Sequence, residues 1–525
     1  MSRLTDYTRY ADAQRYFSRQ RLWELFDGDA ESFNIAHECV DRHAASGRDA
    51  VIVVHADGSD ETISYAELAA QSSRFAHYLR ASGMTPGDRV AIMLEPSRAF
   101  YVAMFGALKA GVIAVPLFTL FGPDGLALRI KDCEPAMLVT DVQKVRQVQA
   151  SDSLRVVAFD AALFAALQEY PATYDIHTRG DSMAAFQYTS GTTRELPEAV
   201  KHTHRTLVTL MVAGLYGTGI RPGDRFICPS SPAWGHGLWH GTFAPLALGL
   251  TIGAYAGRFD ARRLLQALQD HRFTNLSAAA THYRMMRNSG AGAEYRYFLE
   301  KLSFTGEPID PETATFARET FGHEVCSMYG TTEIGVVLVN YPGAEDFVVK
   351  SGSLGKPPPG LRLEVQDENG APVPAGTVGH LMVHRHEGWV PTRDLARQDE
   401  EGYFYHAGRA DDVIISAGWT MSAVEIENAI LAHPDVQEAA AIGVADELRG
   451  QVVKAFVISA RPASEAFSKE IQELVKSRLS LHEYPRHVAF VPELPKTPAG
   501  KINRKTLRDN EHKINATAKT EENPA

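Results

Sequence analysis

Between residues 61 and 117 the hydrophobic pattern alternates between helical and extended periods, and this alternation restricts the fold more than any other feature. Ser64 and Glu67 have the spacing of a capping box at the start of TISYAELAAQSSRFAHYLRASG, a helical stretch that Gly83 ends. After the turn TPGD, RVAIMLEP predicts a strand, SRAFYVAMFGALKAG a helix and VIAVPL a second buried strand. Strand, helix and strand with short turns form a βαβ unit, so we expect a parallel sheet covered by helices.

The second half of the chain has a different character. Prolines and glycines cluster in KPPPG and ENGAPVPAG within residues 352–400, between the short strands LRLEVQ and HLMVH, which predicts a small, mostly antiparallel β unit. Beyond Gly408 the pattern becomes helix, strand, strand, helix and strand, with Ser422 and Glu425 spaced to cap the first helix. The predicted fold class is therefore α/β, with a large N-terminal region of parallel sheets plus a small β unit, followed by a small α+β domain.

Composition excludes several classes of protein. The chain has 525 residues, a formal charge of −11, 45% hydrophobic and 22% charged residues, which are ordinary globular values. A wholly disordered chain and a nucleic-acid binder that relies on a large basic excess are both excluded. The longest uncharged stretch, residues 241–257, contains a proline and four glycines and is too short for a membrane span. With no apolar signal segment at the N-terminus, we expect a cytoplasmic protein.

The cysteines predict neither a disulfide framework nor a structural zinc site. They are far apart and form no CxxC pair, so buried free thiols are the better interpretation. The four residues are Cys39, Cys133, Cys228 and Cys326.

One loop has the composition of a phosphate site. Residues 186–204 read FQYTSGTTRELPEAVKHTH, so a strand-like start leads into hydroxyl side chains and a glycine. Backbone N–H groups and hydroxyls of such a loop can surround phosphate oxygens. The Walker pattern GxxxxGK[ST] is absent, and an ordinary Ser/Thr turn explains this loop equally well when it is taken alone.

Three further segments decide between these interpretations. They read SMYGTTEIG at 327–335, HAGRADDVIISAGWTMSAVEIE at 406–427 and LPKTPAGKINR at 494–504. In this order and at these separations, the four segments resemble the adenylate-forming superfamily, which includes acyl- and aryl-CoA ligases, peptide-synthetase adenylation domains and firefly luciferase. The resemblance extends from about Phe33 to Arg508.

The resemblance implies a two-step reaction with ATP, Mg²⁺ and coenzyme A. A carboxylate attacks the α-phosphate of ATP to give an acyl-adenylate and pyrophosphate, and a thiol then attacks the acyl carbon and releases AMP. The first step brings two anions together, so catalysis must consist mainly of charge neutralisation and alignment.

The resemblance also assigns roles in the nucleotide site. Tyr329 would stack on adenine, Thr332 would hydrogen-bond the α-phosphate, and Glu333 would bind Mg²⁺, a hard cation that favours oxygen ligands. The remaining implied contacts are the phosphate loop Thr189, Ser190, Gly191, Thr192 and Thr193, the adenine segment Gly306, Glu307 and Pro308, and Gly330 and Thr331 beside Tyr329.

Other implied residues lie near the C-terminus. Asp394 matches the aspartate that accepts both ribose hydroxyls, which suits a carboxylate, and Arg409 also contacts the ribose. Lys501 would bridge the carboxylate and the α-phosphate, a task that suits a point cation on a flexible stem. Asp411 matches the hinge, while Gly418 and Trp419 lie where the CoA channel passes.

These matches predict the domain organisation. We expect an N-terminal AMP- and acyl-binding domain over 1–407, a hinge over 408–412, a mobile C-terminal domain with the catalytic lysine over 413–508, and a disordered tail over 509–525.

The phosphate loop departs from the family pattern. The usual S-G-T-T-G-x-P-K-G is replaced by SGTTRELPEAV, so Glu198 stands where a lysine is expected. Either Arg194 or Lys201 supplies the missing cation, or the loop takes another path.

The resemblance also implies that the acyl pocket is lined by the segment after the phosphate loop, by an alanine-rich strand and by the residues before the YGTTE segment. Small residues and two tryptophans indicate an aromatic, alicyclic or medium-chain acid rather than acetate, although both tryptophans also suit an ordinary core. The candidates are Trp234, His236, Trp239, Ala279, Ala280 and Thr305.

The predicted function is an AMP-forming carboxylic acid–CoA ligase that acts on small molecules, and its oligomeric state is left open. Two alternatives remain at this point: a free-standing enzyme that loads a carrier protein, and a nucleotide-binding protein without turnover. Retention of Lys501, Glu333, Asp394 and Arg409 argues against the second.

Overall fold

The structure is a computed structural model of the chain. It describes residues 2–121, 123–145, 148, 154–188, 198–331, 334–409, 414–416, 419–421, 423–446, 450–479, 484–497 and 501–511. The chain divides into two compact units, the first formed by residues 1–306, 313–349 and 357–360, and the second by residues 307–312, 350–356 and 361–525.

The first unit contains an eight-stranded sheet in the order β14-β13-β12-β11-β9-β10-β1-β2. The central strands are parallel, and β2 and β14 pair antiparallel at the two edges. The strands are β1 (Asp49–His55), β2 (Asp60–Ser64), β9 (Arg225–Cys228), β10 (Thr251–Ala256), β11 (Asn275–Ala279), β12 (Lys301–Thr305), β13 (Val325–Thr331) and β14 (Gly335–Val339).

A second sheet of the same unit has six strands in the order β6-β5-β3-β4-β7-β8. The predicted βαβ unit is confirmed, because β3 and β4 are parallel and α4 (Arg98–Lys109) connects them. The edge strand β8 runs antiparallel to β7, and the other neighbouring pairs among the described strands are parallel. The strands are β3 (Arg89–Met93), β4 (Ile113–Pro116), β5 (Met137–Thr140), β6 (Arg155–Ala158), β7 (Met183–Gln187) and β8 (Val200–Thr203).

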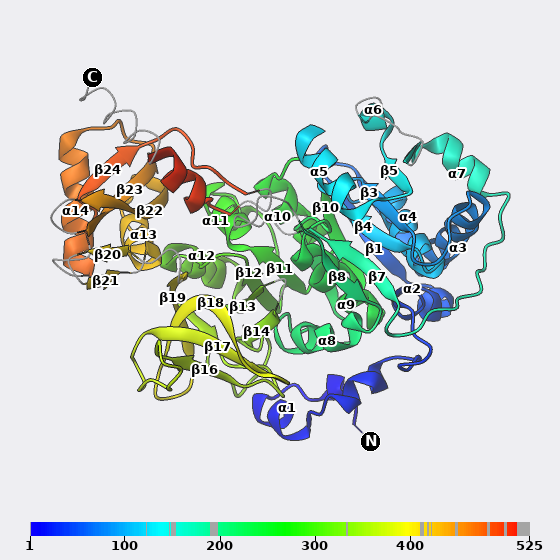
Figure 1. The fold of residues 1–525 in the computed structure, drawn as a ribbon, viewed down its shortest axis with the longest axis horizontal. Coiled ribbons are helices and arrows are strands. Elements are labelled where there is room, and N and C mark those ends of the chain that lie inside the picture. Colours follow the sequence, from blue (N-terminus) through cyan, green and yellow to red (C-terminus); the bar gives the residue numbers. More distant parts are fainter. Residues whose placement is uncertain are drawn as a thin grey trace. The chain divides into compact units, whose positions relative to one another are not determined.

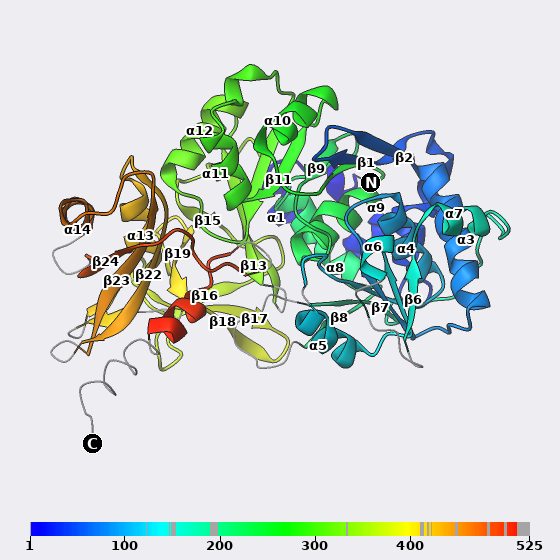
Figure 2. The same ribbon diagram turned by 90° about the horizontal axis from the view of Figure 1, so that it is seen from above.

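Helices cover these sheets, as the sequence predicts. In α3 (Tyr65–Ala81) the Ser64 hydroxyl accepts the Glu67 N–H at 3.1 Å, so the Ser64 half of the predicted capping box is confirmed. Figure 1 shows α3 and α4 side by side, and α10 and α11 lie together near β11 in Figure 2. The other α-helices are α1 (Tyr10–Tyr16), α2 (Ile35–Cys39), α5 (Pro123–Cys133), α6 (Val142–Val145), α7 (Ala161–Leu167), α8 (Thr206–Tyr216), α9 (Ala244–Ala247), α10 (Ala261–Asp270), α11 (Ala280–Asn288) and α12 (Pro311–Phe321).

Several helical segments are not α-helices. The segment η4 (His236–Phe243) is a π-helix, which is uncommon and frequent at functional sites. The segments η1 (Leu4–Asp6), η2 (Gln20–Leu25), η3 (Asp41–Ser46) and η5 (Gly292–Glu294) are 3₁₀-helices.

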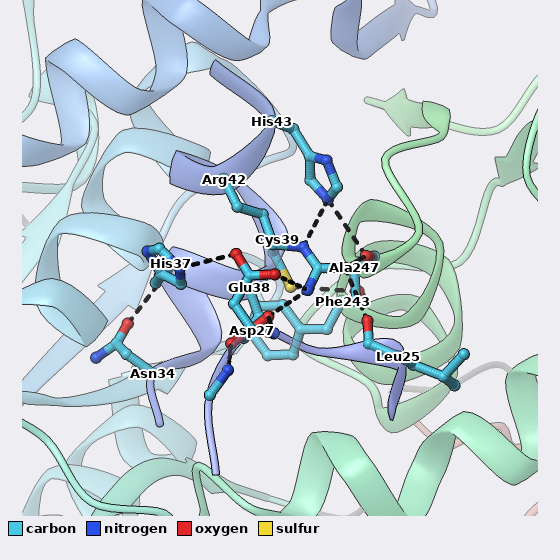
Figure 3. Close-up of polar contacts among 11 residues, drawn as sticks. Leu25, Asp27, Asn34, His37, Glu38, Cys39, Arg42, His43, Phe243 and Ala247 are labelled. Atoms are coloured by element: carbon cyan, nitrogen blue, oxygen red, sulfur yellow. Dashed lines mark hydrogen bonds and ion pairs between the residues drawn. The ribbon is translucent and has the colours of Figure 1, made fainter. Parts of the chain in front are cut away.

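A buried ion pair holds the N-terminal segment to the core of the first unit (Figure 3). Glu38 is fully buried, and its carboxylate accepts the backbone N–H groups of 27–28 at 3.1 and 2.8 Å and the Arg42 guanidinium at 2.6 Å. Arg42 also donates to the carbonyl oxygens of Leu25 and Ala247 at 2.8 and 2.9 Å. Because both Glu38 oxygens accept hydrogen bonds and the Arg42 guanidinium donates to three acceptors, the charges of this pair are compensated.

The second unit begins with the predicted antiparallel β unit, which is confirmed. Its five strands follow the order β15-β19-β18-β17-β16, and every neighbouring pair is antiparallel. The strands are β15 (Ser353–Gly355), β16 (Leu363–Gln366), β17 (Gly379–Arg385), β18 (Gly388–Gln398) and β19 (Phe404–Arg409).

The C-terminal part of this unit also follows the predicted order of helix, strand, strand, helix and strand. It contains α13 (Ala423–Leu431), β22 (Val436–Asp446), β23 (Gly450–Ser459), α14 (Glu465–Arg478) and β24 (His487–Phe490), and Figure 1 shows β22, β23 and β24 side by side. The sequence did not predict the short strands β20 (Ile414–Ser416) and β21 (Trp419–Met421). The expected cap Ser422 lies outside the described residues.

Other expectations can be compared directly with the structure. All four cysteines are buried and free, as predicted. Among the described residues, no helix combines the length and the apolar character that crossing a membrane requires. Residues 504–511 are helical, so the first three residues of the predicted tail belong to a helix, and the rest of that tail lies outside the described residues.

Candidate active site

The carboxyl ends of three parallel strands bring predicted site residues of the first unit to one edge of the eight-stranded sheet. Ala279 at the end of β11 lies opposite Thr305 at the end of β12, and Phe304 lies opposite Ser327 of β13. Tyr329 follows two residues later on β13, so it reaches the same edge. Ligands of open α/β sheets bind at this edge, outside the carboxyl ends of the strands.

Two glycines at this edge have structural reasons for lacking a side chain. Gly306 follows β12 with a φ of 101°, a conformation that favours glycine. A Cβ atom at Gly330 would lie 2.1 Å from the Gly335 carbonyl oxygen, so β13 and β14 could not approach so closely with any other residue. Thr331 is the last residue of β13, and Ala280 is the first residue of α11.

His236 lies in a row of buried hydroxyl groups. Its Nδ1 is 3.0 Å from the Ser230 hydroxyl, and its Nε2 is 2.8 Å from the Ser277 hydroxyl, which in turn accepts from Ser303 at 2.8 Å. Cys228 lies 3.8 Å from the ring, but burial raises the pKa of its thiol to about 12. The thiol is therefore protonated at neutral pH, and this pair is not an activated nucleophile.

The two candidate tryptophans have different environments. Trp239 is 3% exposed, and its indole N–H donates to the Gln187 side-chain oxygen at 3.1 Å. Trp234 is half-buried, with its ring 5.3 Å from that of His236. Both belong to the segment after β9 that contains η4, beside the carboxyl edge.

A single carboxylate connects the two ends of the predicted phosphate loop. Asp132 of α5 accepts the Tyr188 hydroxyl at 2.7 Å and the Ala199 backbone N–H at 3.2 Å, both on Oδ2. Burial and the hydrogen bond to Asp132 raise the pKa of Tyr188, so its hydroxyl stays a donor. Residues 189–193 and Arg194 lie outside the described residues, whereas Glu198 is described and exposed.

In the second unit, the two predicted ribose residues are neighbours. Asp394 of β18 pairs directly with Arg409 of β19, so the register of this hairpin brings the two positions together. Asp394 is 4% exposed, and its carboxylate lies 3.6 Å from the His406 ring. Its backbone N–H donates to the Thr392 hydroxyl at 3.2 Å. The neighbouring residue Arg393 has a φ of 66°, a costly conformation for a residue with a side chain.

Lys501 lies in a short loop of the same unit that is held at its base. The Thr497 N–H donates to the Lys501 carbonyl oxygen at 2.7 Å, and the Lys501 N–H donates to the Thr497 hydroxyl at 3.2 Å. Three residues further on, the Arg504 guanidinium forms two bonds with Glu427 of α13, at 2.9 and 2.5 Å. The lysine loop is therefore tied to α13 by a bidentate ion pair, the strongest kind of charged hydrogen bond.

Several predicted residues cannot be placed. Thr332, Glu333, Asp411 and Gly418 lie outside the described residues, as does the phosphate loop. Trp419 is described only as the first residue of β21, which pairs with β20. Glu307 and Pro308 belong to the second unit.

The structure also reveals residues that the sequence patterns did not suggest, namely Asp132, Gln187, Glu427 and Arg504. Each acts across a long separation in sequence, 56 residues between Asp132 and Tyr188 and 77 between Glu427 and Arg504. No local periodicity or motif marks such pairs. For Arg504, its place at the end of LPKTPAGKINR was the one available signal.

Comparison with known proteins gives consistent matches over the chain. The family described as AMP-binding enzyme matches residues 40–388, and the AMP-binding enzyme C-terminal domain matches residues 425–501. An acetyl-coenzyme A synthetase of Bacillus subtilis is 31% identical, with 90% of each chain covered. A 4-hydroxybutyrate–CoA ligase of Metallosphaera sedula is 31% identical, with 86% of each chain covered. The crystal structure of a benzoate CoA ligase from Burkholderia xenovorans is 29% identical with a TM-score of 0.79, and the alignment covers 91% of this chain and all of that one.

Proposed function

The chain belongs to the family of AMP-binding enzymes and is an AMP-forming carboxylic acid–CoA ligase, and we propose that its acid is aromatic, alicyclic or of medium chain length. ATP and coenzyme A are its co-substrates. The observation that supports this choice of acid is the lining of the carboxyl edge, where the small residues Ala279 and Ala280 lie on the strand-to-helix turn and Trp234 and Trp239 lie on the segment after β9. Small residues leave room for an acyl group, and indole rings offer it an apolar wall.

The nucleotide roles follow from the positions at the strand ends. Tyr329 at the end of β13 stacks on adenine, and Thr332, three residues later, hydrogen-bonds the α-phosphate. Asp394 accepts the two ribose hydroxyls. Arg409, which pairs with Asp394 on the neighbouring strand β19, also contacts the ribose. Lys501 approaches the carboxylate and the α-phosphate, where its charge offsets the repulsion between the two anions.

Glu333 is the proposed ligand of Mg²⁺. Its carboxylate is the kind of oxygen donor that this cation prefers, and Mg²⁺ bound there would neutralise phosphate charge. No cluster of three or more acidic, histidine or cysteine side chains that could hold a metal occurs within the described ranges, which do not include Glu333.

The two domains proposed here are an N-terminal domain over 1–407 and a mobile domain over 413–508, joined at a hinge that contains Asp411. Rotation about that hinge presents Lys501 for adenylation and then the segment with Gly418 and Trp419 for the thiol step. We also propose that the enzyme works in the cytoplasm, where ATP and coenzyme A are both available.

A panel of acids tests this proposal. AMP release is followed with ATP and Mg²⁺ for acetate, hexanoate, cyclohexanecarboxylate and benzoate, with and without coenzyme A. Release that depends on coenzyme A and favours any of the last three acids supports the proposal. A preference for acetate would refute the assignment of the acid, and release that occurs only with a carrier protein would favour the loading enzyme instead.

A further inference from the structure

A buried amide next to Trp239 has an unpaired donor. Gln187, the last residue of β7, is 1% exposed, and one atom of its amide lies 3.1 Å from the Trp239 indole nitrogen. Because an indole N–H is only a donor, that atom must be the amide oxygen. The other atom, Nε2, is therefore an NH₂ group, and it has no hydrogen-bond partner among the described residues. A buried donor without an acceptor is unusual and indicates a missing partner.

A second unpaired atom lies near the same indole. The His202 ring of β8 is 4.8 Å from the Trp239 ring, and its Nε2 atom is buried without a partner in the described part of the chain. Burial lowers the pKa of His202 to about 4, so the ring is neutral at neutral pH and offers one donor and one acceptor.

The strand register places both side chains on one face of the sheet. β7 and β8 are antiparallel, with Gln187 opposite Val200 and Ala185 opposite His202, and alternate residues of a strand share a face. Lys201 belongs to the opposite face, where its ammonium group lies over the Phe186 ring. Lys201, which is next to His202 in the sequence, therefore points away from Gln187, His202 and Trp239.

These residues also adjoin the place where the acid is activated. Gln187 is two residues before Thr189, the first residue of the predicted phosphate loop, and Trp239 belongs to η4. Gly235, just before η4, also adjoins Gln187, since a Cβ atom there would be in ordinary contact with the Gln187 oxygen at 3.4 Å.

We propose that Gln187, His202 and Trp239 form a neutral polar subsite, which selects carboxylic acids that carry an uncharged oxygen group, a hydroxyl or a carbonyl, away from the reacting carboxylate. This inference rests on the proposed function and specifies its substrate class. A hydroxyl or carbonyl oxygen accepts from the Gln187 NH₂ group, and a hydroxyl can also bond the neutral His202 ring. A purely hydrocarbon acid leaves both atoms unpaired, and a second carboxylate would enter a site whose contacts, among the described residues, include no cation.

Matched acids test this selection on the wild-type enzyme. The kcat/KM for CoA-dependent AMP release is measured for hexanoate, 6-hydroxyhexanoate and adipate, and for benzoate with 3- and 4-hydroxybenzoate. In at least one series, we expect kcat/KM for a hydroxylated acid to be roughly 10-fold or more above that for its parent acid. The kcat/KM for adipate should not exceed that for hexanoate. Turnover of the parent acids that equals or exceeds that of the hydroxylated ones, or a preference for adipate, would overturn the subsite while leaving the ligase activity intact. If none of these acids turns over, the proposed acid class is wrong and the subsite falls with it.

Variants separate the subsite from a general effect on the active site. Gln187→Met keeps the length of the side chain but removes the donor, so it should abolish the preference for the hydroxylated acid over its parent. Gln143→Met makes the same change at an exposed residue of α6 and should keep the preference. If Gln187→Met does not fold, His202→Phe provides the second test, with loss of preference again expected. A preference unchanged in the folded variants would show that these atoms do not contact the acid.

Discussion

Asp132→Ala should weaken ATP binding by releasing both ends of the phosphate loop. The carboxylate accepts one hydrogen bond on each side of residues 189–197, from Tyr188 at 2.7 Å and from the Ala199 N–H at 3.2 Å. When Asp132 is removed, the Tyr188 hydroxyl still has a second acceptor, the Arg129 carbonyl oxygen at 3.0 Å. The Ala199 N–H belongs to a residue that is only 7% exposed, so water has little access to replace its lost acceptor. At ~0.5–1.5 kcal/mol for each bond, the loss is about 1–3 kcal/mol, with the lower half favoured because Asp132 itself is exposed. Since 1.4 kcal/mol is a factor of ten, we expect KM for ATP to rise roughly 10-fold.

The two half-reactions make this prediction specific. Adenylation is measured as pyrophosphate release at varied ATP, and thioester formation is measured from supplied acyl-adenylate and coenzyme A. Asp132→Ala should slow the first and leave the second within about 2-fold, because the pyrophosphate has already left. Tyr188→Phe, which removes one of the two bonds, should have an intermediate effect.

Asp29→Ala provides the matched control. Asp29 is also exposed and also accepts two backbone N–H groups, from residues 31 and 32 at 2.9 and 3.0 Å, but it lies far from the loop in sequence. This variant should keep the wild-type KM for ATP. An unchanged KM for ATP in Asp132→Ala, or equal losses in both half-reactions, would refute a role for Asp132 in positioning the loop.

Three other predictions concern catalysis, stability and pH. Lys501→Ala should lower the rate of acyl-adenylate formation by on the order of 10²–10³ while the thiol step survives, and equal losses in separate assays of the two steps would contradict its proposed role. Arg42→Ala should lower the free energy of unfolding by about 3–5 kcal/mol in denaturant titrations, because it leaves the fully buried Glu38 carboxylate uncompensated, and Glu38→Gln in the same background should restore part of the loss. Burial lowers the pKa of His204 to about 3, whereas the same side chain titrates near pH ~6.5 in the unfolded chain. Between these two values only the unfolded chain binds the proton. The free energy of unfolding therefore falls by ~1.4 kcal/mol for each unit that the pH drops from 6.5 toward 3. His204→Asn can still accept the Ile35 N–H. It should reduce the slope of unfolding free energy against pH by ~1.4 kcal/mol per pH unit between pH 6 and 4, which corresponds to one proton. An unchanged slope would show that His204 is not its source.

The sequence by itself determined the local elements and the identity of the reaction. The Ser64 cap, the helix that follows and the strands β3 and β4 each depend on residues within a few positions, where hydrophobic period and capping act directly. The four motif segments and their order identified the family for the same reason, because each segment is a continuous string. The acid class, the site residues and the domain boundaries inferred from them remain predictions.

Only the tertiary structure decided which distant residues meet. Asp132 joins two loop ends that are 56 and 67 residues away, and strand register sets Asp394 beside Arg409. The register of β7 and β8 places Gln187 and His202 on one face, near a tryptophan 52 residues from Gln187. Such contacts depend on sheet order and on burial, which arise from packing of the whole unit and leave no periodic signal in the sequence. For that reason the sequence could mark Trp239 only as a candidate, and the fold was needed to show that its indole N–H donates to a buried amide whose Nε2 atom has no partner among the described residues.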